Sequence, residues 1–232
     1  MSNIILSAKN ISKSFVKTNS EKLEVLKNVS LEIEKQKISM IVGASGAGKS
    51  TLLHIVSGLD KADSGSVEIS STNIFSLSDD KLSKFRNKHI GFVFQFNHLL
   101  PEFDAQENVA IPMMIAGESL AKSKKKAAEL LDLVGLSERL THRPSELSGG
   151  EAQRAAIARA LANKPDIIFA DEPTGNLDSA NSELLHKLIF DLRDQISATF
   201  LIVTHNPALI KLGDVVFEMK DGKIFKEEGE KG

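Results

Sequence analysis

Residues 43–50, GASGAGKS, have the spacing of a phosphate-binding loop: Gly43, four residues, then Gly48, Lys49 and Ser50. Glycines let backbone N–H groups turn toward phosphate oxygens, where a Cβ would collide. Lys49 can supply positive charge to the β- and γ-phosphates, and the Ser50 hydroxyl can ligate Mg²⁺. The alternative is a glycine-rich turn that matches by chance. The predicted nucleotide-binding residues are Gly43, Ala44, Ser45, Gly46, Ala47, Gly48, Lys49, Ser50 and Thr51.

The flanks of this loop predict the elements that would hold it in place. Residues 38–42 are largely apolar and mostly β-branched, which is typical of a buried strand, and residues 49–56 have the pattern of a helix. The helix N-terminus would add unpaired N–H groups and the positive end of its dipole. Because a chance match would not require these flanks, they favour nucleotide binding.

A second apolar strand, predicted over 167–170, ends in the carboxylates Asp171 and Glu172. Side chains alternate between the faces of a strand, so the two carboxylates can have different roles. Asp171 could hold Mg²⁺ through its water shell, and Glu172 could polarise the attacking water. The alternative is a solvated acidic pair at a strand end. The position of Asp171 and Glu172 downstream of a P-loop favours catalysis.

The sequence LSGGE precedes a predicted helix over 149–162, with Ser148 at the entrance and glycines that expose backbone N–H groups. This arrangement predicts a second anion site, and the alternative is an ordinary serine N-cap. A second phosphate-type site makes sense if it completes a site on another copy of the protein. The motif comprises Leu147, Ser148, Gly149, Gly150 and Glu151.

These three motifs, in this order, resemble the nucleotide-binding domain of ATP-binding cassette (ABC) transporters, and the resemblance covers essentially the whole chain. It implies an ATPase with ATP and Mg²⁺ as ligands and integral membrane permease subunits as partners. It also implies an ATP-dependent head-to-tail homodimer, in which residues 148–150 of one subunit close on the γ-phosphate held by Lys49 of the other.

The resemblance assigns further roles residue by residue. Gln95 matches the glutamine that touches Mg²⁺ or water and couples to the membrane subunits, so the implied metal-site residues are Ser50, Gln95 and Asp171. His205 matches the histidine that contacts the γ-phosphate. Phe15 matches the aromatic residue that stacks on adenine; the family often has Tyr there, and Phe keeps the π-face. Glu151, where many members have Gln, receives no separate role. The D-loop, which crosses the dimer interface, is matched by Asn176, Leu177 and Asp178.

Residues 91–113 and 170–178 are similar to a group that contains the ATPases of lipoprotein-releasing, macrolide-export and cell-division complexes, and they are most similar to the lipoprotein-releasing type. An apolar cluster beside Gln95 has two interpretations: an internal core for a helical insert, or a groove that receives a short helix from a membrane subunit. His98 belongs to this cluster, and the predicted docking residues are Phe96, Leu99, Leu100 and Phe103.

The remaining pattern predicts an α/β P-loop NTPase core, with a mainly parallel sheet, an N-terminal antiparallel β subdomain and an inserted helical subdomain. Apolar residues alternate over 4–8, 23–25 and 29–33, with a polar turn near 18–22 between the first two strands. We expect one ABC ATPase domain over 1–232, with the core in 1–95 and 161–232 and the helical subdomain in 96–160. The lysine run 122–126 is interpreted as a solvated helix face rather than a binding patch.

The 232-residue chain has 41% hydrophobic residues, 26% charged residues, a net charge of −2 and no cysteine. The net charge therefore gives no support for nucleic-acid binding. No stretch approaches the ~20 apolar residues of a membrane span. We expect a peripheral ATPase subunit on the cytoplasmic face of the inner membrane, which drives lipoprotein release toward the outer membrane. The alternatives are a macrolide-export-like or cell-division-type complex and, more remotely, a soluble ABC ATPase in DNA repair or translation.

Overall fold

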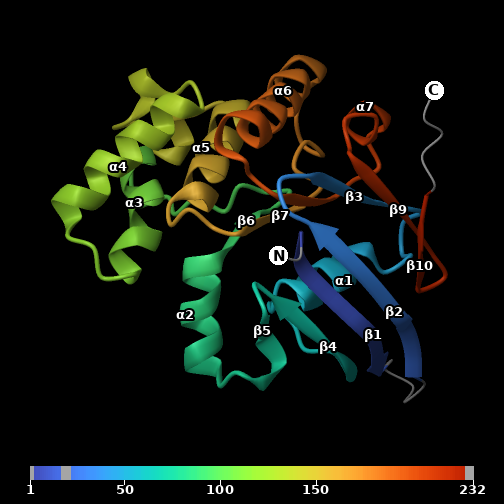
Figure 1. The fold of residues 1–232 in the computed structure, drawn as a ribbon. Helices are drawn as coiled ribbons and strands as arrows, with labels where there is room; N and C mark the ends of the chain where they lie inside the picture. Colours follow the sequence, from blue (N-terminus) through green and yellow to red (C-terminus); the bar gives the residue numbers. More distant parts are fainter. Residues whose placement is uncertain (1–2, 17–21, 228–232) are drawn as a thin grey trace.

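The computed structural model describes residues 3–16 and 22–227, and its centre is a six-stranded sheet with the order β10-β9-β3-β8-β7-β6 (Figure 1). All neighbouring pairs are parallel except β9 and β10. Both faces of the parallel strands are buried: in β7, Ile167 and Phe169 enter one core, and Ile168 and Ala170 enter the other. The strands are β3 (Ile38–Val42), β6 (Ile90–Val93), β7 (Ile167–Asp171), β8 (Phe200–Val203), β9 (Val215–Lys220) and β10 (Lys223–Lys226).

One face of this sheet is covered by α1 (Lys49–Val56) and, beyond it, by a four-stranded antiparallel sheet. Leu52 and Leu53 of α1 are fully buried in the core that both sheets share. A short 3-10 helix at 74–76 and α2 (Asp79–His89) lead from the antiparallel sheet back to β6. The antiparallel sheet has the order β2-β1-β4-β5 and comprises β1 (Ile4–Val16), β2 (Lys22–Glu34), β4 (Ser64–Ile69) and β5 (Thr72–Asn73).

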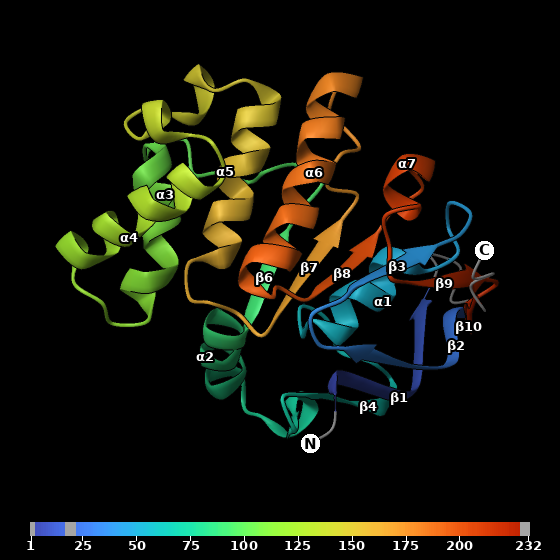
Figure 2. The same cartoon turned by 45° about the horizontal axis from the view of Figure 1, so that its top comes forward.

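The other face of the parallel sheet is covered by α5 (Gly149–Leu161) and α6 (Ser179–Ile196), which lie side by side across it (Figure 2). The helices α3 (Ala105–Ile115) and α4 (Leu120–Leu133) lie beyond the β6 edge and pack against α5. Short 3-10 helices at 137–139 and 144–146 and the four-residue α7 (Pro207–Ile210) complete the helical elements of the described chain.

The elements that flank the P-loop begin and end at the predicted residues, and α5 ends one residue before the helix predicted over 149–162. The separate strands predicted at 23–25 and 29–33 are wrong, because β2 runs through both. Asn28, with φ of 56°, and register shifts against β1 interrupt the alternation without ending the strand. Residues 18–21 of the predicted turn lie outside the described residues, and Lys22 already belongs to β2.

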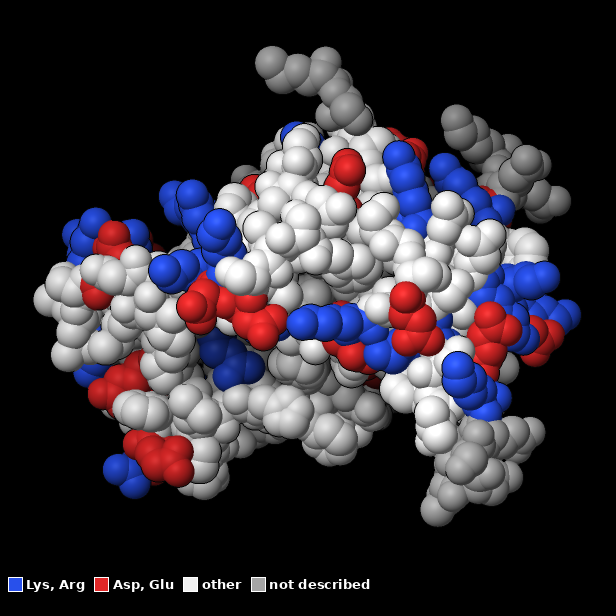
Figure 3. Space-filling model, turned by 90° about the horizontal axis from the view of Figure 1, so that it is seen from below, with Lys and Arg blue, Asp and Glu red and all other residues white. Residues whose placement is uncertain are grey.

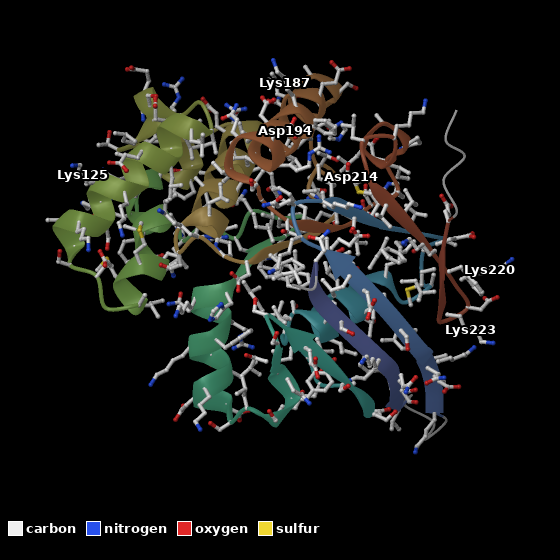
Figure 4. The ribbon with its side chains drawn as sticks, in the orientation of Figure 1. Lys125, Lys187, Asp194, Asp214, Lys220 and Lys223 are labelled. Carbon is white, nitrogen blue, oxygen red and sulfur yellow. The ribbon has the colours of Figure 1, made fainter. Side chains whose placement is uncertain are left out.

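The lysine run 122–126 lies on α4, where two carboxylates pair with three of its four lysines. Two of its lysines pair with Glu118, and Lys124 pairs with Glu107 at 3.0 Å. Lys125 lies at the outer edge of α4 (Figure 4). On the face seen from below, basic and acidic side chains are interspersed rather than gathered by sign (Figure 3). In neither place do basic side chains gather without acidic ones, as they do on a surface that binds nucleic acid.

Candidate active site

The P-loop connects the end of β3 to the start of α1, and its glycines are required by the backbone. Gly43 has φ of 145°, and a Cβ there would lie 2.1 Å from the carbonyl oxygen of Met219. Gly48, with φ of 101°, begins α1 from the left-handed region, which favours glycine. The ammonium of Lys49 donates to the carbonyls of Gly43 at 2.9 Å and Ala44 at 3.0 Å. The loop therefore holds the lysine charge against its own backbone at the predicted phosphate site.

The predicted metal-site residues Ser50 and Asp171 are brought into contact from different elements. Ser50 lies in the first turn of α1, and its hydroxyl donates to Asp171 Oδ1 at 3.0 Å. Burial raises the pKa of Asp171, and hydrogen bonding from Ser50 opposes this shift. A nearby cation would stabilise the charged carboxylate. A hydroxyl and a carboxylate are hard oxygen ligands, so this pair fits Mg²⁺.

His54 is a neighbour of this pair that the sequence analysis did not identify. Its Nε2 lies 3.9 Å from Asp171 Oδ2. The only signal in the sequence was its position four residues after Ser50, on the same face of α1. A histidine at this distance adds positive charge beside Asp171 only when it is protonated.

Glu172 and His205 meet because they follow β7 and β8, which are parallel neighbours. His205 Nδ1 lies 2.7 Å from Glu172 Oε1, and the His205 backbone N–H lies 3.4 Å from Oε2. Glu172 has φ of 46°, a strained conformation for a residue with a side chain. Its backbone is held by bonds to Val203 O at 2.9 Å and from Gly175 N at 3.0 Å. A carboxylate fixed in this way can orient and deprotonate a water molecule.

The predicted P-loop, Gln95, Glu172 and His205 line a common cleft of about 630 Å³. Gln95 and Asn176 of the D-loop bond reciprocally: Gln95 Nε2 donates to Asn176 Oδ1 at 3.3 Å, and Asn176 Nδ2 donates to the Gln95 carbonyl at 3.3 Å. Val25 of β2 also lines the cleft. The sequence analysis placed Val25 in a strand and gave no signal for a role in the site.

Several predicted groups do not line this cleft, among them Asp171, the D-loop residues, Phe15 and the LSGGE residues. Phe15 lies on β1 with 44% of its surface exposed, and Lys13 Nζ lies 5.2 Å from its ring centroid. Adenine stacking therefore stays a prediction. The LSGGE residues lie at the start of α5, where the Ser148 hydroxyl accepts from the Glu151 N–H at 3.2 Å. A Cβ on Gly150 would lie 2.1 Å from Asn181 Oδ1, so this glycine lets α5 pack closely on the start of α6.

Glu151 has a structural role, which corrects the expectation that it has none. Its carboxylate accepts from the Ser148 N–H at 2.8 Å and from Arg139 Nε at 2.8 Å. Together with the serine cap, the first bond completes a capping box. The backbone N–H of Ser148 and the guanidinium of Arg139 lower the pKa of Glu151 to about 2. The carboxylate thus stays charged at the entrance of α5.

The predicted docking cluster divides into exposed and buried residues. Phe96 is 64% exposed, Leu100 is 43% exposed and Phe103 is 40% exposed. Leu99 is buried in the core formed with α3, α4 and α5. Leu99 therefore corrects the prediction that all four form an accessible surface, since its side chain belongs to the internal core.

Residues 26–175 match the family model described as ABC transporter. The lipoprotein-releasing system ATP-binding protein LolD of Bacteroides fragilis is 55% identical over 88% of this chain and 94% of its own length. The protein of the same name from Porphyromonas gingivalis is 51% identical over 97% of this chain and 100% of its own. A dimeric ATP-binding cassette solved in a post-hydrolysis state with ADP and Pi is 40% identical, with a TM-score of 0.88 over 98% of this chain and 99% of its own.

Replacing Glu172 with Gln should retain ATP binding and reduce turnover by about 10²- to 10⁴-fold, since the amide cannot accept the proton of water. Nucleotide titration and a phosphate-release assay measure the two quantities separately. Near-normal turnover with intact binding would remove Glu172 from the catalytic role.

The low pKa of Glu151 predicts a pH-dependent contribution to stability. Its folded pKa of about 2 lies below the ordinary 4.5, so the contribution is full above pH 4.5 and is lost as pH falls toward 2. Glu151→Gln should therefore lower the free energy of unfolding more at about pH 7 than at about pH 4. Urea titrations of both proteins test this; a difference that does not change with pH would show that the charge is not responsible.

Proposed function

Because the chain belongs to the ABC transporter family and is an ATPase of that family, we propose that it is the ATP-hydrolysing subunit of a lipoprotein-releasing membrane complex. The enzymatic part of the proposal is carried by the Glu172–His205 pair, which lines the same cleft as the P-loop. The lipoprotein assignment is supported by relatives of that name whose similarity extends over most or nearly all of the chain.

In the proposed reaction, P-loop N–H groups and Lys49 bind the ATP phosphates, and Phe15 stacks on adenine. Ser50, Asp171 and Gln95 would hold Mg²⁺, which neutralises charge on the β- and γ-phosphate oxygens when bound. Glu172 orients the attacking water and accepts its proton, while His205 holds the carboxylate and contacts the γ-phosphate. The γ-phosphoryl group passes to the water oxygen, and the products are ADP and inorganic phosphate.

The signature residues are proposed to act on the second copy of a head-to-tail dimer. They do not line the cleft of their own chain, yet the first turn of α5 has N–H groups that lack partners within the helix. Asn176, Leu177 and Asp178, beside this helix start, would cross the same interface. The dimeric solved cassettes support the dimer itself.

The membrane partners are proposed to be integral permease subunits that contact Phe96, Leu100 and Phe103. Within the described residues, no helix combines the length and apolar character that a membrane span needs. We propose that the chain lies peripherally on the cytoplasmic face of the inner membrane, bound to those subunits. The division into a core of 1–95 and 161–232 and a helical subdomain of 96–160 belongs to the same proposal, in which the two parts move relative to each other.

The whole assignment predicts that the chain, purified from native membranes with its integral partners, releases lipoproteins from proteoliposomes when ATP is supplied. Lipoprotein in the soluble fraction is measured, and the same complex carrying Glu172→Gln serves as the control. ATP hydrolysis by the complex without any release of lipoprotein would contradict this substrate assignment.

The composite site predicts that Glu172→Gln with ATP and Mg²⁺ dimerises, whereas wild type without nucleotide is mainly monomeric. Adding Ser148→Arg should block dimerisation, because a bulky side chain would occupy the position where phosphate meets the N–H groups of α5. Light scattering measures the mass, and nucleotide titration verifies that the P-loop still binds ATP. Dimerisation of the double variant would count against this interface.

The docking proposal predicts that Leu100→Glu weakens co-purification with the membrane subunits and leaves ATP affinity nearly unchanged. Leu99→Glu is the matched control. It buries a charge in the helical core and should mainly lower the free energy of unfolding, by roughly several kcal/mol, and with it the melting temperature. Melting temperature and co-purification are measured on both variants. A stable Leu100→Glu protein that still assembles fully would remove Leu100 from the docking surface.

A further inference from the structure

The segment of residues 94–104 joins β6 to α3 without forming a helix or strand. It carries Gln95 into the nucleotide cleft and exposes Phe96, Leu100 and Phe103. The backbone N–H and C=O groups of such a segment need partners from elsewhere in the protein. Those partners determine whether the segment follows the parallel sheet or the helices.

The first half of the segment is held by two side chains of α5. Gln153 Nε2 donates to the carbonyl of Phe94 at 2.8 Å. Arg159 Nη2 donates to the carbonyl of Asn97 at 2.7 Å, and Arg159 Nη1 donates to that of His98 at 2.6 Å. Three carbonyls within five residues of chain are therefore bound by one helix.

The second half is held by Asn108 of α3, whose side chain is fully buried. Asn108 Oδ1 accepts from the Leu100 N–H at 2.7 Å, and Nδ2 donates to the carbonyls of Leu100 and Phe103, both at 3.1 Å. An amide that satisfies both a donor and acceptors fixes the backbone more tightly than a single bond. The segment is thus bonded to α5 and α3 along its length.

Arg159 is placed for this contact rather than for an ion pair. Burial lowers the pKa of Arg159, and no ion pair involves it within the described part of the chain. Its planar fork instead bonds two consecutive carbonyls through two separate nitrogens held at a fixed spacing, which the single ammonium nitrogen of lysine lacks. His98, the second of these residues, has φ of 47°, a conformation that needs support from its surroundings.

The helix that carries Gln153 and Arg159 begins at the signature. From Ser148 at its cap, α5 extends for 13 residues, a length of about 20 Å. Most of its side chains are buried, so it moves as one body. A displacement of its first turn is therefore transferred to the carbonyls of residues 94, 97 and 98.

We propose that Gln153 and Arg159 are positioning residues that couple the signature end of α5 to the segment 94–104. When the signature closes on nucleotide, this connection shifts Gln95 in the cleft together with the apolar side chains on the surface. The inference rests on the proposed function for the nucleotide-driven closure. The connection itself is a feature of the single chain.

Amide hydrogen exchange of the nucleotide-free chain tests the connection. Arg159→Met should speed exchange of the Leu99 and Leu100 amides, which bond to Asn97 Oδ1 and Asn108 Oδ1, by about tenfold or more. Arg159→Lys keeps the charge but replaces two donor nitrogens with one, so its exchange rate should lie between those of Met and wild type. Unchanged exchange in Arg159→Met would overturn the inference.

A matched control variant separates the contact from general loss of stability. Asn163→Ala removes bonds from the residue just beyond α5 to the Asn87 and Pro112 carbonyls, which lie outside the segment. It should lower the melting temperature without speeding exchange at Leu99 and Leu100. Equal acceleration in Asn163→Ala and Arg159→Met would show a general structural effect and overturn the assignment to Arg159.

The coupling is tested in the Glu172→Gln background with ATP and Mg²⁺. The parent should dimerise and change exchange within 94–104; adding Arg159→Met should retain dimerisation and reduce that change about fivefold or more, with Arg159→Lys restoring part of it. A dimeric Arg159→Met variant that shows the full change would overturn the coupling alone. A parent that stays monomeric would overturn the dimer proposal, and this coupling with it.

Discussion

Four parallel strands end at one edge of the central sheet, and the candidate site depends on this constraint. The P-loop follows β3, Gln95 follows β6, the Asp171–Glu172 pair lies at the end of β7, and His205 follows β8. Residues up to 162 positions apart in the chain therefore line one cleft. Antiparallel pairing of any of these strands would move its terminal residues to the opposite edge, away from the phosphate loop. The two buried cores hold this edge fixed because each parallel strand packs side chains on both faces.

Rigidity at this edge allows the site to hold a strained residue. Glu172 leaves β7 in a left-handed conformation, and the bonds to Val203 and from Gly175 keep it there. If the backbone were extended at this position, the Glu172 side chain would point to the other face of the strand. The observed turn instead directs the carboxylate toward His205 on the neighbouring strand. The strain is thus part of what brings the carboxylate to the cleft.

Local patterns were sufficient to predict the helices over 49–56 and 149–162 and the buried strands over 38–42 and 167–170, because hydrophobic periodicity and the Ser148 cap act over a few positions. The contacts between Ser50 and Asp171 and between Glu172 and His205 could be anticipated only through the resemblance, since they depend on strand order. The approach of His54 and Val25 to the site could not be predicted, because single side chains on a helix or strand have no distinguishing spacing. The burial of Leu99 between exposed neighbours depends on how Asn97 and Asn108 shape an irregular backbone.

The two signature glycines differ in what requires them, and the difference indicates where a ligand approaches. At Gly150 the fold itself requires glycine, because a Cβ would collide with Asn181. At Gly149 the nearest atom to a Cβ among the described residues would be Leu177 Cδ2 at 3.7 Å, an ordinary contact, and the helical backbone is open to any residue. Gly149 is the first residue of α5 and has room where a Cβ would lie, so packing within the chain does not account for this glycine. The composite site proposed above would account for it, because phosphate oxygens bound to a second copy would approach the first-turn N–H groups from outside the subunit.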